Sequence, residues 1–140
     1  MKYQIRTYQK SILADTATPV SLYLKFRDLF PGSILLESSD YHGGQDNFSF
    51  ICLSPLTGIQ IDMGLVTTTF PDQEPSSYPS ENIPSVLEDF FNSFTPINHE
   101  LDHLNGFFGY MSYDAAPYFE KVPKQDNNSE YRLHCFFLPR

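Results

Sequence analysis

The sequence of 140 residues contains no tryptophan, two cysteines and nine basic residues against 17 acidic ones. The formal net charge of −8 argues against a nucleic-acid partner, because phosphate binding needs clustered lysine and arginine and these nine are scattered. The two cysteines, Cys52 and Cys135, are too few to cross-link a small secreted scaffold, and they lack the spacing of metal ligands. We therefore expect two reduced, buried thiols.

Long apolar runs are also absent. No stretch approaches the roughly 18 apolar residues of a membrane-spanning helix. The N-terminal segment MKYQIRTYQKSIL has positive charges but no apolar core of the length that a signal peptide needs. These absences predict a cytoplasmic protein with no membrane partner.

The catalytic signatures G-x-S-x-G, P-loop and G-x-G-x-x-G are missing, but the segment 99–103, HELDH, matches the H-E-x-x-H pattern of zinc peptidases. Such a site needs both histidines on one face of a regular helix and a third protein ligand. The extended pattern would place that ligand at Gly109, which offers no side chain, and Pro96 and Gly106 leave room only for a short helix. We interpret the segment as a solvated helical turn and expect no metal, with a zinc peptidase kept as an alternative.

Two helices are predicted from capping residues and apolar spacing. The first spans 19–30, with Thr18 as N-cap and Pro19 in the first turn, and Pro31-Gly32 ends it. The second begins at the capping box 85–88. The residues expected on the inner faces are Leu22, Phe26, Leu29 and Phe30 for the first helix, and Val86, Leu87, Phe90, Phe91 and Phe94 for the second.

Apolar runs between turn residues predict strands, and the first two pairs are expected to form hairpins. The predicted strands are 33–38, 47–54, 58–63, 66–70, 106–113 and 131–140. Segments 71–84 and 121–130 read as polar loops, and Asp114 is expected to cap a short helix that runs to Phe119. The fold class is therefore mixed α+β, an antiparallel β-sheet with flanking helices. Because the sequence stops directly after an apolar strand, we expect a piece of a longer protein.

Three separated segments resemble the N-terminal region of anthranilate synthase component I. They are LLESSD (35–40), NFSFICLSP (47–55) and NGFFGYMSYDAAPYFE (105–120), and the resemblance extends over about residues 17 to 140. It implies that residues 1–140 form the N-terminal regulatory domain, an incomplete half of a larger two-layer fold whose C-terminal chorismate-binding domain is absent. That resemblance also assigns the HELDH match to a variable stretch of the family.

The resemblance further implies what the intact enzyme does. It is a lyase of tryptophan biosynthesis that adds ammonia to chorismate and releases pyruvate, giving anthranilate with the help of Mg²⁺. Ammonia comes from a glutamine amidotransferase subunit, component II. The ligands of chorismate and of the metal belong to the missing half, so we expect no catalytic residue in this chain and no activity from it alone. The isolated chain is expected to expose apolar surface and to self-associate.

What the chain should contain is part of the feedback site for tryptophan. In the family the segment matching Leu36, Glu37 and Ser38 lines the inhibitor pocket, the serine matching Ser49 lies close by, and Pro19 matches a proline near the pocket. A glutamate can accept charge-assisted hydrogen bonds from the ammonium of an amino acid, hydroxyls can orient it, and leucines can flank an indole ring. From the residues alone, this segment reads as the solvent-exposed end of a strand entering a turn, and only the resemblance of the other segments favours a ligand site.

Two alternatives stay open. A sister enzyme, the aminodeoxychorismate synthase large subunit, shares the fold and carries similar segments. A free-standing binding module is the other alternative.

The sequence also departs from the family at one place. The family often has a basic residue and a glycine just before the serine strand, where this sequence has Asp46, Asn47 and Phe48, so side-chain contacts from there are not expected.

Overall fold

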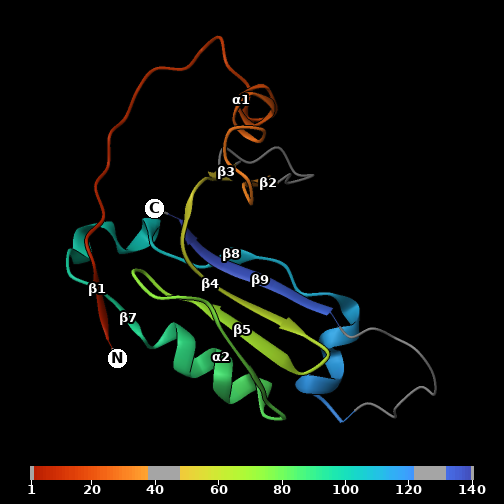
Figure 1. Cartoon of the computed structure of the whole chain (residues 1–140). Helices are drawn as coiled ribbons and strands as arrows, with labels where there is room; N and C mark the ends of the chain where they lie inside the picture. The colour runs from red at the N-terminus through yellow and green to blue at the C-terminus, as the bar shows by residue number, and fades with distance from the viewer. Residues whose placement is uncertain (1, 38–47, 122–131, 140) are drawn as a thin grey trace.

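The computed structural model describes residues 2–37, 48–121 and 132–139, and of residues 99, 102, 103, 114 and 132–139 the backbone alone. Its centre is a five-stranded sheet in the order β6-β5-β4-β9-β8, in which every neighbouring pair is antiparallel. A helix, α2, covers one face of this sheet (Figure 1). The predicted mixed α+β class is confirmed. The strands are β4 (Pro55–Asp62), β5 (Leu65–Thr69), β6 (Ser76–Pro79), β8 (Phe108–Gly109) and β9 (Arg132–Pro139).

The β4–β5 hairpin is built as its sequence predicts. Met63 and Gly64 occupy its two-residue turn with φ of 48° and 77°, the left-handed conformation that a type I′ turn requires and glycine adopts without strain. Along β4, Ile59 and Ile61 alternate toward the core with Val66 of β5. The turn residues therefore determine where the hairpin reverses, and the apolar alternation determines which of its faces is buried.

Helix α2 (Ile83–Phe91) supplies the other side of the core through Ile83, Leu87 and Phe90. The predicted capping box at Ser85 is wrong. The N-cap is Asn82, whose Oδ1 accepts a hydrogen bond from the backbone N–H of Ser85 at 3.3 Å. The helix begins earlier than predicted because Asn82 supplies the cap and Pro84 fits the first turn without a lost hydrogen bond.

Aromatic rings continue the core toward two short strands, β1 (Tyr3–Ile5) and β7 (Phe94–Pro96), which pair in parallel. Phe94 was expected on α2, but the helix ends at Phe91, and Phe94 lies in β7 with its ring centroid 5.4 Å from that of Tyr3. Phe90 contacts Phe94 from the helix at 5.5 Å. This pairing fixes the N-terminal segment against the end of the α2 layer.

Two further predictions are corrected. Segment 71–84 is not entirely loop, because β6 pairs with β5 at the edge of the sheet. All four of its residues are exposed, so its sequence carries no apolar alternation to reveal it. Segment 106–113 is a strand over only two residues, and Tyr110, Met111 and Tyr113 are exposed. The helix that follows is a 3-10 helix, η2 (Tyr113–Tyr118), so Asp114 lies inside it rather than capping it.

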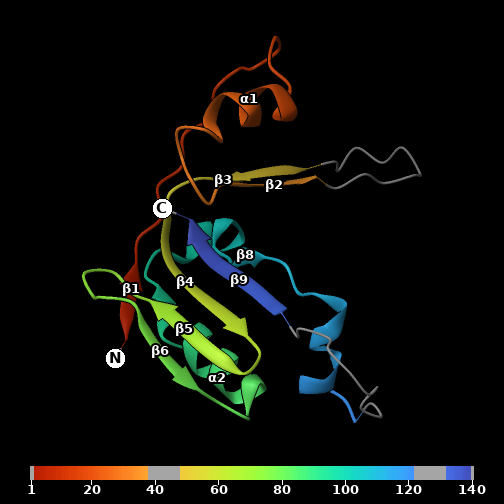
Figure 2. The ribbon, with the colours of Figure 1, turned by 45° about the vertical axis from the view of Figure 1, so that its right-hand side comes forward.

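A smaller unit stands beside the main sheet (Figure 2). It consists of α1 (Pro19–Phe26) and the antiparallel hairpin of β2 (Ile34–Glu37) and β3 (Ser49–Cys52). The start of α1 is confirmed: Thr18 caps it and Pro19 is in the first turn. Its end is not, since the helix stops at Phe26 and the following residues form turns. The hairpin is confirmed, and its tip, which includes Ser38, lies outside the described residues.

Candidate functional site

The register of the β2–β3 hairpin sets Glu37 directly opposite Ser49. Directly opposed residues of an antiparallel pair have Cβ atoms about 4.5–5.5 Å apart and point to the same face. Both side chains are exposed at the end of the hairpin. A carboxylate and a hydroxyl from two strands that are separated by 11 residues in the sequence thus lie side by side.

One face of this hairpin is turned toward the main sheet and the other toward α1. Leu36 pairs with Phe50 on one face, and the ring of Phe50 lies 5.2 Å from that of Phe108 in β8. This face is therefore turned toward the main sheet. Because the hairpin lies between the main sheet and α1 (Figure 2), the opposite face, with Glu37 and Ser49, is turned toward α1.

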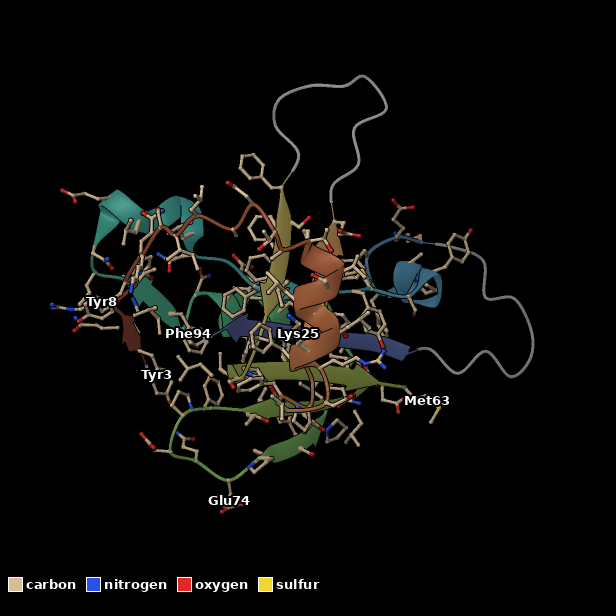
Figure 3. All side chains as sticks on the ribbon, turned by 90° about the horizontal axis from the view of Figure 1, so that it is seen from above. Tyr3, Tyr8, Lys25, Met63, Glu74 and Phe94 are labelled. Atoms are coloured by element: carbon tan, nitrogen blue, oxygen red, sulfur yellow. The ribbon has the colours of Figure 1, made fainter. Side chains whose placement is uncertain are left out.

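The start of α1 lies at the same end of the unit as Glu37. The helix runs antiparallel to β2 (Figure 2), and the hydroxyl of Tyr23 donates a hydrogen bond to the carbonyl of Ser33 at 3.3 Å, just before the strand begins. Seen from above, Lys25 marks the end of α1 that is away from the end of β2 (Figure 3). Pro19 therefore lies toward Glu37 and Ser49, and among the expected site residues that the structure describes, Leu36 projects from the other face.

The helix start is well defined and carries a favourable electrostatic environment for an anion. The Oγ1 of Thr18 accepts a hydrogen bond from the N–H of Ser21 at 3.1 Å, and the Oγ of Ser21 accepts one from the N–H of Thr18 at 3.1 Å. No acidic side chain occupies the first turn. The positive end of the helix dipole therefore faces the site unopposed by its own turn. The candidate site therefore has two different ends: the helix start suits a carboxylate, and Glu37 suits an ammonium.

Sequence reasoning missed the residues that form the wall between helix and hairpin. Leu35 and Ile51 are paired with each other and share the face of Glu37 and Ser49, and both are partly buried. The alternation of strand residues could have identified them, because Leu35 and Glu37 are two positions apart. Tyr23 could not be found this way, since its contact with Ser33 depends on how α1 folds back.

The HELDH segment has a different backbone from that of a zinc-peptidase helix. It begins a 3-10 helix, η1 (His99–Leu104), with a kink at Leu101, where φ is −110° and ψ is 16°. The one-face geometry of an H-E-x-x-H motif needs an uninterrupted α-helix. The predicted short helical turn is confirmed. Among the residues whose side chains the structure describes, no group of three or more His, Cys, Asp or Glu could hold a metal ion.

Glu37 and Ser49 thus lie exposed, opposite each other, in a small α+β unit whose helix α1 packs beside the hairpin (Figure 2). Comparison with curated proteins identifies relatives of this chain. The chain is 30% identical over 123 residues to anthranilate synthase component 1 of Thermus thermophilus, which covers 86% of this chain. It is 28% identical over 132 residues to the protein of the same name from Lactococcus lactis, covering 92% of this chain.

A third relative, anthranilate synthase component 1 of Bacillus subtilis, is 27% identical over 135 residues, 94% of this chain. The chain spans about a quarter of the length of these relatives: 25%, 27% and 25%. No family model matches the chain. No solved structure matches it either. The resemblance to anthranilate synthase component I that the three sequence segments carry is confirmed.

Neither α1 nor α2, nor any other helix of the described residues, is long and apolar enough to cross a membrane.

Proposed function

We propose that this chain is the N-terminal regulatory domain of an anthranilate synthase component I, and that it contributes the tryptophan feedback site. The observation that carries the proposal is the similarity of about nine tenths of the chain to component 1 from three organisms. The geometry supports the ligand: Glu37, Ser49 and the start of α1 come together at one end of a small unit.

In the parent enzyme, chorismate accepts ammonia and loses water and pyruvate to give anthranilate, in the cytoplasm. Ammonia is delivered by component II, the glutamine amidotransferase partner. Mg²⁺ and chorismate are held by the C-terminal domain, outside these 140 residues. The chain alone is therefore inactive, and its role in the parent is regulation and contact with the other domain.

The proposed pocket matches an amino acid group by group. The ammonium of tryptophan lies against the carboxylate of Glu37 in a charge-assisted hydrogen bond. The hydroxyls of Ser38 and Ser49 orient the polar end, and the ligand carboxylate lies toward the helix start beside Pro19, where the dipole favours a negative charge. The indole lies against apolar side chains. Leu36, whose side chain is on the other face, contributes backbone to the pocket wall.

Feedback inhibition follows if tryptophan binds an inactive arrangement of the parent more tightly than the active one. A ligand shifts such an equilibrium only by its difference in affinity for the two states. Loss of one or two charge-assisted hydrogen bonds, each worth about 1.5–3 kcal/mol, weakens that preference by about tenfold or more. The site can therefore be tested by inhibition while catalysis serves as an internal reference.

The experiment uses the full-length parent with Ser38→Phe, which fills the space of the ligand's polar end, and with Glu37→Ala, which removes the ammonium's partner. Anthranilate production is measured against tryptophan concentration. We expect the concentration for half inhibition to rise about tenfold or more, with the uninhibited rate within a few-fold of the parent. Glu88→Ala, an exposed carboxylate on α2, is the matched control.

An unmoved inhibition curve for folded Ser38→Phe would show that the site lies elsewhere. A parent that makes aminodeoxychorismate in place of anthranilate would assign the chain to the sister enzyme.

A further inference from the structure

Residues 6–14, which we call the arm, connect β1 to the turn before α1 without regular secondary structure. The arm is held at its beginning, where the N–H of Thr7 donates to the Oδ1 of Asn98 at 3.0 Å and the Nδ2 of Asn98 donates to the carbonyl of Thr7 at 2.6 Å. From there it arches away from the main sheet toward α1 (Figure 1). The arm is thus tethered at both ends and presented to solvent between them.

The arm exposes three large apolar side chains. Tyr8, Ile12 and Leu13 are 83%, 76% and 87% exposed, among the most exposed apolar residues of the described chain. Single exposed apolar residues need no explanation, but three lie within six positions here, two of them adjacent, and clustered exposed apolar side chains mark interaction sites. The arm therefore has the character of a docking segment.

Charge indicates what the arm docks on. Residues 1–14 contain Lys2, Arg6 and Lys10 and none of the 17 acidic residues of the chain. By contrast, residues 28–120 contain no lysine or arginine and 14 of those 17. Among the described residues the one ion pair joins Arg27 and Asp28, so Arg6 and Lys10 have no acidic partner there. The body of the chain is thus opposite in charge to the arm, and in a second copy that body offers acidic partners for Arg6 and Lys10.

One part of that body matches the arm in length and chemistry. Strand β6 lies at the edge of the sheet, and the exposed carboxylates Asp72, Glu74 and Glu81 flank it. The ring of Tyr78 in β6 is 40% exposed and offers apolar surface for a contact. An extended arm from 6 to 13 spans roughly 23 Å, and the stretch from 72 to 81 at most roughly 30 Å. We call this stretch, residues 72–81, the acidic edge.

We propose that the arm of one copy binds the acidic edge of a second copy, and that the reciprocal contact completes a two-fold symmetric dimer. Arg6 and Lys10 pair with the carboxylates, and the apolar side chains of the arm pack beside Tyr78. Pro75 and Pro79 remove two backbone N–H donors from the edge, so we expect side chains to carry most of the contact. Two equivalent arm contacts supply the area that one short segment could not. This proposal is independent of the proposed function.

The test is a charge exchange in the 140-residue chain, followed by analytical ultracentrifugation at low ionic strength. One variant carries Arg6→Glu and Lys10→Glu, the other Glu74→Lys and Glu81→Lys. Each is expected to raise the dimer dissociation constant roughly tenfold or more, because like charges then face each other. An equimolar mixture of the two variants should recover the parent's dimer, since the mixed pair has one reversed and one original contact, both complementary.

The matched control carries Lys25→Glu and Glu88→Lys, which reverse exposed charges outside both segments and should leave the dissociation constant unchanged. A second variant of the arm, Ile12→Ser with Leu13→Ser, should weaken the dimer without altering charge, and circular dichroism establishes that each variant is folded. A chain that stays monomeric up to high concentration, or a dimer that ignores the arm variants, or a mixture that does not recover, would each overturn the proposal.

Discussion

At the scale of the residue, Cys52 of β3 is nearly enclosed, and burial raises the pKa of its thiol above the ordinary value. The thiolate is the reactive form, so the folded chain should react slowly with Ellman's reagent at about pH 8. In a Cys135→Ser background we expect labelling of Cys52 roughly tenfold slower or more than in denaturant. The folded state favours the neutral thiol, so this group's contribution to stability is present at neutral pH and is lost as pH rises above the ordinary thiol pKa. Equal labelling rates for the folded chain and the denatured chain would contradict the predicted protection of Cys52.

The candidate site shows how far the sequence identifies single functional residues. Glu37 and Ser49 were identified through segments that resemble a family, and nothing in their own surroundings in the sequence joins them. The structure adds the register that sets them opposite each other. That register depends on the geometry of the turn and on which face is buried, and the local sequence leaves both open. The alternation of side chains along the strand turns Leu36 away from Glu37.

At the scale of the element, the start of α1 is the most clearly encoded. We expect Thr18→Ala to destabilise the unit by about 1 kcal/mol, since it removes a capping side chain from a helix that contains no fully buried residue. Thr16→Ala, in the exposed turn before the helix, should have little effect. Chemical denaturation followed by circular dichroism measures both. If Thr18→Ala and Thr16→Ala unfold at the same denaturant concentration, the cap does not stabilise the helix.

Local signals predicted the hairpins and failed at edges. The β4–β5 pair follows from the alternation of Ile59 and Ile61 and from the glycine of its turn. Strand β6 has no such signal, because an edge strand whose side chains are all exposed needs no apolar residues. The pairing of β1 with β7 was equally invisible, since it joins segments about 90 positions apart and depends on the stacking of Tyr3 with Phe94. Strands with a clear apolar pattern in their own sequence were found, and the short or fully exposed strands β1, β6 and β7 were not.

At the scale of the whole molecule, four exposed large apolar side chains follow the short strand β8 within ten residues. We call the residues Tyr110, Met111, Tyr113 and Phe119 the apolar strip. All four are exposed, Tyr113 to 94%. Segment 106–113 was predicted to be a buried strand because it is rich in apolar and aromatic residues. Such residues are typical of a surface that another part of a protein covers. Because the curated relatives are about four times as long, we infer that the rest of the parent covers the apolar strip.

The apolar strip can be tested in the isolated chain with a dye that fluoresces on apolar surface, such as anilinonaphthalene sulfonate. We expect the folded chain to bind the dye, and Tyr113→Ser with Phe119→Ser to reduce the fluorescence by roughly half, since they remove two of the four side chains. Leu29→Ser with Met63→Asn is the control, because both side chains are as exposed but lie outside the strip. The asparagine also tolerates the positive φ of position 63. In the full-length parent the dye should bind less per chain than in the isolated chain, and the strip variants should change that signal little. Equal dye binding per chain in both proteins would mean that the strip stays open in the parent and has some other partner.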